Sequence, residues 1–221
     1  MVEYKTLEVE QLIPFNVRNI RPQVVDKIKE RIALGYNPAK PLVVTKTKEG
    51  FIVADGNHRL QALKEIGIQS VPCIIYDDKD PYSLAVTSNQ DEDTYAPMDL
   101  FDWLDIIKKL REEGLTQAQI GDRIGWSREQ VRNYIFVLDK VGTEVLDLAR
   151  KHQNGRVPKN GTIVPFDFTE GWFRNSGLYD LCEKYQLALI EAFIADKCKW
   201  NNAKVQKEAA KYKRWQEYIE L

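Results

Sequence analysis

The chain has 221 residues, 43% of them hydrophobic, and a formal net charge of -1 at pH 7. This length is enough for one large domain or two small ones, each with a hydrophobic core. The near-neutral charge excludes a uniformly basic nucleic-acid-binding protein, so any contact with DNA requires a local basic patch. No stretch reaches the ~18 consecutive apolar residues that a membrane span needs, and the N-terminal residues lack the apolar region of a secretory signal.

The cysteines indicate a reducing environment. Cys73, Cys182 and Cys198 are widely spaced and odd in number, which fits neither a disulfide framework nor a metal cluster. We therefore expect a soluble, cytoplasmic protein.

The first 80 or so residues alternate strand and helix patterns. We expect an entry strand through YKTLEVEQLI that ends at Pro14, and then a helix from Gln23 that stops at Gly35. The segments PLVVTKT and FIVA predict two strands around a turn at residues 48–50. The segment HRLQALKEI predicts a helix, and VPCIIYD predicts a further strand. Strands interleaved with helices at this spacing indicate a small mixed α/β domain.

Helical patterns dominate from Pro97 onward. A helix from Met98 places Leu100, Leu104, Ile107 and Leu110 on one face. Residues 160–168 are rich in turn and strand formers, and residues 179–221 predict helix. The expected fold class is α+β, with domains at residues 1–90, 97–150 and 151–221.

Residues 115–135, LTQAQIGDRIGWSREQVRNYI, have the spacing of a helix-turn-helix. Thr116 can cap the first helix, the small Gly121 allows close packing, and Gly125 suits a turn that needs positive φ. Ser127 can cap the second helix, with Gln130 three residues later as in a capping box. The second helix would bury one apolar side, formed by Val131, Ile135 and Leu138.

The outward side of this motif can reach DNA phosphates and base edges in a major groove. The alternative is an ordinary helical hairpin with a solvated charged face. The acidic residues of the preceding helix, Asp99, Asp102 and Asp105, are expected to face away from DNA. The expected DNA-binding residues are Thr116, Gln117, Ser127, Arg128, Gln130, Arg132 and Asn133.

The sequence DGNHR, residues 55–59, predicts a phosphate site where a helix begins. Gly56 lets the backbone approach an anion, Arg59 can hold a phosphate with two hydrogen bonds, and His58 can donate another. Asn57 offers an amide at the turn. The alternative is a plain turn in which Asn57 caps the helix and the charges are solvated. With two histidines in the chain, we expect no histidine metal site.

Several segments together resemble the ParB/sulfiredoxin superfamily. FIVADGNHRLQALKEIGIQSVPCIIYD is similar to the core of the ParB N-terminal domain, and LIPFNVRNIRP followed by a helix and PLVV is similar to the family's first box. LTQAQIGDRIGWSREQVRNYIFVLDKV resembles the ParB helix-turn-helix. The resemblance covers residues 7–150 in order. Asn57 stands where sulfiredoxin has its reactive cysteine, so sulfiredoxin chemistry is not expected.

The resemblance implies a DNA-binding protein of chromosome, plasmid or phage partition that binds CTP with Mg²⁺. It also implies a homodimer that closes into a clamp on DNA, and it leaves a partner partition ATPase open. By position, Arg18 and residues 56–59 would hold the nucleotide, and Asn89 would coordinate the metal. Ser88 and Glu92 depart from the family's Glu and Arg, so CTP hydrolysis is left open.

A second hypothesis is a small-molecule kinase of the free amino acid type, in which Asp55 is the catalytic base beside the Asp-Gly-Asn-His-Arg turn. Beyond residue 150, Trp172, Phe173 and Tyr185 are expected in a core. Residues 197–214 hold seven Lys or Arg residues and one acid. They predict either a basic solvated helix or a second phosphate-contacting surface.

Overall fold

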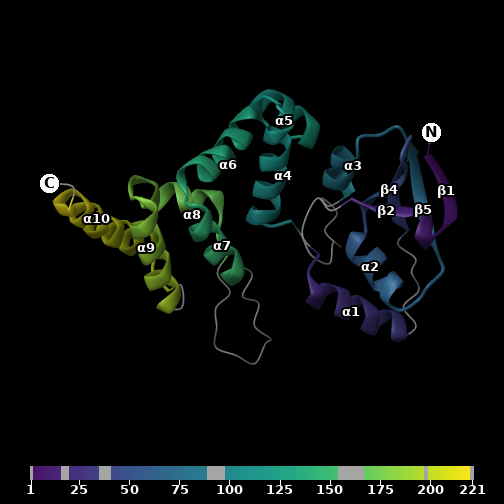
Figure 1. Cartoon of the computed structure of the whole chain (residues 1–221), viewed down its shortest axis with the longest axis horizontal. Coiled ribbons are helices and arrows are strands. Elements are labelled where there is room, and N and C mark those ends of the chain that lie inside the picture. The colour runs from purple at the N-terminus through teal and green to yellow at the C-terminus, as the bar shows by residue number, and fades with distance from the viewer. Residues whose placement is uncertain are drawn as a thin grey trace. The chain divides into compact units, whose positions relative to one another are not determined.

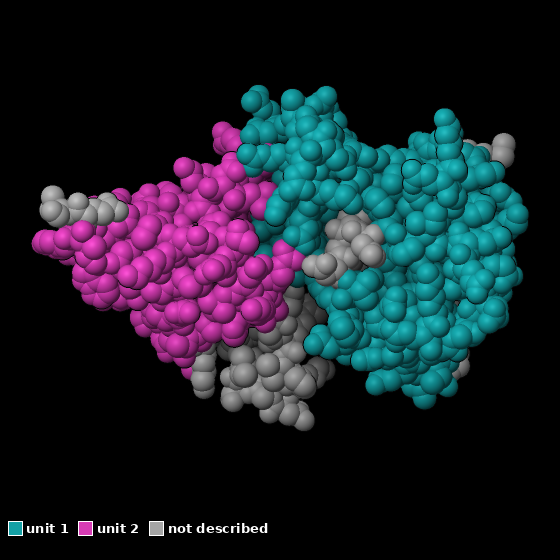
Figure 2. Space-filling model, in the orientation of Figure 1, with its two compact units in different colours: residues 1–128 teal, residues 129–221 magenta. Residues whose placement is uncertain are grey.

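The computed structural model describes residues 2–15, 20–34, 41–88, 98–153, 167–196 and 199–219. The chain forms two compact units, residues 1–128 and residues 129–221 (Figure 2). The predicted domain boundary near residues 90–97 lies outside the described residues. The three-domain division stays a prediction. The two compact units meet in the chain at residues 128 and 129.

The first unit contains a mixed sheet, and its helices come between and after the strands in the chain (Figure 1). Its elements in chain order are β1 Val2–Glu8, η1 Val9–Gln11, β2 Leu12–Pro14, α1 Pro22–Ala33, β3 Leu42–Thr47, β4 Gly50–Asp55, α2 Asn57–Glu65, β5 Ser70–Asp77, α3 Pro81–Ser88, α4 Leu100–Glu112 and α5 Gln117–Ile124.

The sheet has the strand order β1-β5-β3-β4-β2. β1 runs antiparallel to β5 at one edge, and β2 runs parallel to β4 at the other. The prediction of one entry strand ending at Pro14 was therefore wrong in one respect: the segment forms two strands on opposite edges. The 3-10 turn η1 separates them, and the Val9 N–H at its start donates to the Gln69 carbonyl (2.8 Å), the position next in the β1–β5 register.

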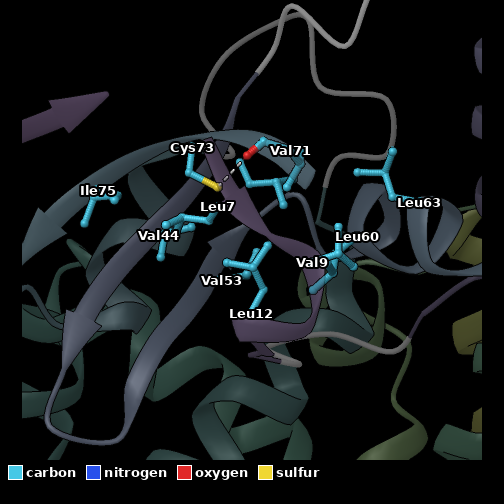
Figure 3. Packing of buried hydrophobic residues seen from close by; sticks show 11 residues of the cluster. Leu7, Val9, Leu12, Val44, Val53, Leu60, Leu63, Val71, Cys73 and Ile75 are labelled. Atoms are coloured by element: carbon cyan, nitrogen blue, oxygen red, sulfur yellow. Dashed lines mark hydrogen bonds between the residues drawn. The ribbon is translucent and has the colours of Figure 1, made fainter. Parts of the chain in front are cut away.

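The core of this unit lies where the buried strand faces meet α2 (Figure 3). β5 shows why: its burial alternates along the strand, with Val71, Cys73 and Ile75 inside, as expected for a strand with one buried face. Burial raises the pKa of the Cys73 thiol to about 11, so it stays protonated and unreactive near neutral pH. The cluster comprises Leu7, Val9, Leu12, Leu42, Val44, Val53, Leu60, Leu63, Val71, Cys73 and Ile75.

The helix predicted from Met98 begins at Leu100, and its four predicted apolar residues are all buried. Asp99 is its N-cap and forms a capping box with Asp102. That the acidic residues of this helix face away from DNA stays a prediction, but Asp102 is 4% exposed and lies inside the fold. The reason is that its carboxylate is paired with the Arg21 guanidinium (2.7 Å).

The second unit is helical. Its elements are α6 Arg128–Lys140 (whose first residue closes the first unit), α7 Thr143–His152, α8 Glu170–Asn175, η2 Leu178–Asp180, α9 Glu183–Ala195 and α10 Asn202–Ile219. On α6, Val131 and Ile135 are buried as predicted, but Val137 is fully buried where Leu138 was expected, and Leu138 is half-buried.

An aromatic cluster forms the core of the second unit. Phe168 packs edge-on against Trp172 (5.0 Å between ring centroids) and is stacked with Phe173 (5.7 Å). The core prediction for Trp172 and Phe173 is confirmed, whereas Tyr185 is half-buried. Among the described residues, no helix has both the length and the apolar character to cross a membrane.

Candidate functional site

The helix α2 begins directly after a glycine-containing turn, as the sequence predicted. Gly56 has φ +96° and is the N-cap of α2, a conformation that L residues avoid. A Cβ atom at this position would lie 2.4 Å from Leu42 Cδ2. Glycine is therefore needed here for both conformation and space, and without a side chain it cannot cap the helix it begins.

Asn57 is held by three backbone groups. Its Oδ1 accepts from the Phe15 N–H (3.1 Å), and its Nδ2 donates to the carbonyls of Phe15 (3.0 Å) and Val53 (2.9 Å). The amide thus ties the segment after β2 to the end of β4 and the start of α2. Contact of Asn57 with a phosphate stays a prediction, and it would require these bonds to break.

His58 is 5% exposed, and its Nε2 accepts a hydrogen bond from the Arg21 N–H (3.0 Å). A nitrogen that accepts carries no proton, so Nε2 cannot donate to a phosphate in this arrangement. The Arg21 guanidinium in turn donates to Asp99 and Asp102, 2.7 Å each. His58 is therefore part of an internal network that joins the start of α2, the start of α1 and α4.

Arg59 is better placed than Asn57 or His58 for contact with an anion. Its side chain is 16% exposed, with Nη1 3.4 Å from the Pro41 carbonyl and Nη2 4.0 Å from Asp55 Oδ2. It lies in the first turn of α2, where backbone N–H groups and the helix dipole favour negative charge. Asp55, 22% exposed, ends β4 directly before this turn.

The remaining residues assigned to nucleotide and metal are Arg18 and Asn89. Both lie outside the described part of the chain, so the structure places neither of them. Ser88 is the last residue of α3. Among the described residues, no three His, Cys, Asp or Glu side chains gather as metal ligands would.

α5 has the termini predicted for the first helix of the motif. Thr116 accepts from the Gln119 N–H, and Gln119 Oε1 accepts from the Thr116 N–H (2.9 Å), which forms a capping box. Gly125 ends the helix with φ +73°. A Cβ atom on Gly121 would lie 2.5 Å from the Trp126 carbonyl oxygen, so the turn packs directly on this glycine. The Trp126 ring packs on Trp103 of α4 (4.3 Å between ring centroids).

The predicted contact residues of the motif differ in exposure. Ser127, Arg128, Gln130 and Arg132 are exposed, whereas Asn133 and Gln117 are half-buried. The Thr116 hydroxyl is engaged in its cap, although the residue is exposed. On α6, Arg132 makes an ion pair with Glu129 (3.0 Å), with both side chains more than half exposed. The second helix of the motif therefore presents its polar side to solvent.

The sequence interpretation missed Arg21 and α3. Arg21 is the N-cap of α1, directly before Pro22, and the two aspartates it holds are spaced as a capping box. α3 anchors α5, because Asp80 at its start accepts from Arg123 (2.8 Å) and the Ser83 hydroxyl donates to the Arg123 carbonyl (2.9 Å). The capping-box spacing was visible in the sequence, whereas the long-range partners were not.

The fold and these two features define a class: a mixed α/β domain with an anion-compatible turn, followed by a helix-turn-helix. Residues 2–90 match the family model of the ParB N-terminal domain. This part of the chain is therefore similar to the ParB N-terminal domain.

Known proteins similar to this chain include Stage 0 sporulation protein J of Bacillus subtilis. It is 26% identical over 118 residues, which cover 52% of this chain and 41% of that protein. An ATP-dependent L-serine kinase of Staphylothermus marinus is 26% identical over 140 residues, which cover 62% of this chain and 52% of that protein. The chain thus spans about half the length of the curated relatives it matches.

A solved structure has a similar fold. It is the C-terminally truncated chromosome-partitioning protein ParB of Caulobacter crescentus, complexed to the centromeric parS site. It is 18% identical, with a TM-score of 0.50, and the match covers 94% of this chain and 99% of that one. At this identity the likeness bears on the fold alone.

Proposed function

We propose that this chain is a DNA-binding protein of the ParB type, acting in DNA partition or regulation, with α6 as its recognition helix. The observation that carries the proposal is the exposed polar side of α6. In the chain, this helix comes after the capped helix α5 and the turn at Gly125. The similarity to Stage 0 sporulation protein J and to the ParB protein complexed to the parS site supports it.

The exposed side chains of α6 have the chemistry of groove recognition. Arg128 and Arg132 can bind phosphates or the O6 and N7 atoms of guanine, and Gln130 can bind adenine. The ion pair of Arg132 with Glu129 does not oppose this, because exposed pairs contribute only about 0–1 kcal/mol. A phosphate can replace the carboxylate at little cost.

Arg132→Ala is expected to weaken binding of the chain to double-stranded DNA by about tenfold, since a charged hydrogen bond is worth roughly 1.5–3 kcal/mol. The slope of log affinity against log salt should fall by about 0.9 for one lost phosphate contact. Fluorescence anisotropy across a salt series measures both values. Lys48→Ala, at an exposed position in the turn before β4, is the matched control. Affinity and slope equal to those of the wild type would remove α6 from the interface.

We further propose that the start of α2 binds the phosphates of a CTP-type nucleotide that switches the grip on DNA. Arg59 and the backbone N–H groups that follow Gly56 would hold the phosphates. Asn57 and His58 would shape the turn through their internal hydrogen bonds. Arg18, and Asn89 with Mg²⁺, complete the site that the family resemblance assigns. A bound Mg²⁺ would neutralise phosphate charge.

Nucleotide binding is expected to raise the thermal unfolding midpoint. A ligand at about 100 times its dissociation constant adds about 2.7 kcal/mol, or roughly 5–10 °C for a chain of this size. CTP, ATP, GTP and UTP are compared with and without Mg²⁺. We expect a shift with CTP that disappears in Arg59→Ala, with Lys64→Ala, exposed on α2, as control. If no nucleotide shifts the midpoint, the turn has a purely structural role.

A small-molecule kinase is the second candidate, favoured by the position of Asp55 beside Arg59 (4.0 Å) and by the L-serine kinase relative. Here Asp55 would accept the proton of a substrate hydroxyl, and the nucleotide would be ATP. A shift with ATP alone, followed by ADP formation with hydroxyl amino acids that Asp55→Asn abolishes, would favour this function over a CTP switch.

A homodimer is expected with the DNA-binding function, because a helix-turn-helix commonly reads two half-sites related by two-fold symmetry. The protein would then associate with nucleoid, plasmid or phage DNA. A partition ATPase is a further proposed partner.

A further inference from the structure

α10 carries a basic side that the proposed function does not use. Its residues, Asn202–Ile219, include five Lys or Arg residues and two acidic residues, Glu208 and Glu217. The helix buries Val205 and Ala209 within the second unit. Four basic residues recur at helical spacing on a different side of the helix: Lys204, Lys207, Lys211 and Arg214. We call these four residues, together with Trp215 and Tyr218, the basic face.

The cations of the basic face are accessible to a ligand. Lys207 and Arg214 are exposed and, in the described part of the chain, have no carboxylate partner. Lys204 pairs with Asp196 (3.2 Å) and Lys211 with Glu208 (2.7 Å), with roughly half of each lysine side chain exposed. Exposed pairs of this kind are weak and can exchange a carboxylate for a phosphate.

Two large aromatic side chains extend the same face toward the end of α10. Trp215 is 54% exposed and Tyr218 is 77% exposed. Such rings cost free energy in water and are suited to stacking against sugars or bases beside a charged backbone. Basic residues interleaved with exposed aromatic rings are the side-chain pattern of nucleic-acid-binding surfaces.

We propose that the basic face of α10 is a second DNA-contacting surface, separate from α6, that binds the phosphate backbone without sequence preference. The fifteen residues from Lys204 to Tyr218 rise about 21 Å along the helix, comparable to about six base pairs of B-DNA. The chain as a whole has a net charge of -1, so these cations form a local feature and not part of a general excess.

An anionic membrane is the competing ligand. A helix that lies in a lipid interface places its apolar side into the acyl region. In α10 the residues of that side, Val205 and Ala209, are at most 3% exposed because they pack within the protein. The exposed large apolar side chains of α10, Trp215, Tyr218 and Ile219, are confined to its end, and the rest of the outward side offers cations, so a phosphate polymer fits better than a bilayer.

The test uses the full chain and a duplex of about 30 base pairs without a selected site, measured by anisotropy across a salt series. Lys207→Ala/Arg214→Ala is expected to weaken affinity at least tenfold at low salt and to lower the salt slope by about 1.8, for two lost phosphate contacts. The control Lys184→Ala/Lys213→Ala removes two exposed positive charges off the basic face and should remain close to the wild type.

Two outcomes would overturn the proposal: a slope and affinity equal to those of the control, or binding of the wild type to phosphatidylglycerol vesicles with no binding to the duplex. The Arg128→Ala/Arg132→Ala variant separates this proposal from that for α6. If only the α6 variant loses affinity, the basic face is eliminated and α6 stands. If only the α10 variant loses affinity, the basic face stands for binding without sequence preference, and the role of α6 is decided separately on DNA that contains a selected site.

Discussion

Asn57→Ala is expected to lower the free energy of unfolding by about 3 kcal/mol and the thermal midpoint by roughly 6–12 °C. The side chain makes three hydrogen bonds to backbone groups of Phe15 and Val53. Each contributes about 1 kcal/mol net, and removal leaves partly buried N–H and C=O groups without a partner. The measurement is the unfolding midpoint of the first unit. It is monitored through the fluorescence of Trp103 and Trp126, which both lie in this unit.

Lys64→Ala is the control for this substitution, because it also truncates a side chain of α2 but at an exposed position. The result that contradicts a structural role is an Asn57→Ala protein as stable as the control. If that protein also lost its nucleotide-dependent shift, Asn57 would belong to the phosphate site and not to the scaffold.

Asp102→Ala is expected to lower the free energy of unfolding by about 3 kcal/mol, comparable to the loss of one partner from a buried ion pair. The Asp102 side chain is 5% exposed, and its Oδ2 accepts from the Arg21 guanidinium (2.7 Å) and from the Asp99 N–H (3.1 Å). The substitution removes half of the capping box of α4 and one of the two carboxylates that hold Arg21. Chemical unfolding of the wild type and of Asp102→Ala in parallel gives the difference in their free energies of unfolding.

Asp122→Ala removes the same charge at an exposed position of α5 and should change stability by less than about 0.5 kcal/mol. Asp102→Asn keeps the shape and one acceptor, so an intermediate loss is expected. Equal stability of Asp102→Ala and Asp122→Ala would mean that the link between Arg21 and α4 contributes nothing.

Local patterns predicted most of the elements of the first unit. The strands predicted at PLVVTKT and VPCIIYD correspond to β3 and β5, and the apolar spacing from Gln23 corresponds to α1. The division of the N-terminal segment into β1 and β2 could not be predicted, because the two strands share one continuous pattern and differ only in their partners. α3 was missed because its short apolar run lacks a helical period.

The candidate site was predictable in residue type but not in pairing. The positive φ of Gly125 and the cap at Thr116 were predicted from local chemistry, and the structure has both. The partners of Asn57 and His58 are 42 and 37 residues away in the sequence. A local motif cannot reveal that such side chains are used inside the fold, and so both were assigned to a ligand.

The proposed function requires α6 to read double-stranded DNA. Selection by the full chain from a duplex pool with about 20 random base pairs, at a salt concentration near 0.15 M, tests this requirement. We predict enrichment of one motif with two-fold symmetry, and loss of that enrichment with Arg128→Ala/Arg132→Ala. A pool that stays random with the wild-type protein, or the same motif recovered with the variant, would contradict the claim.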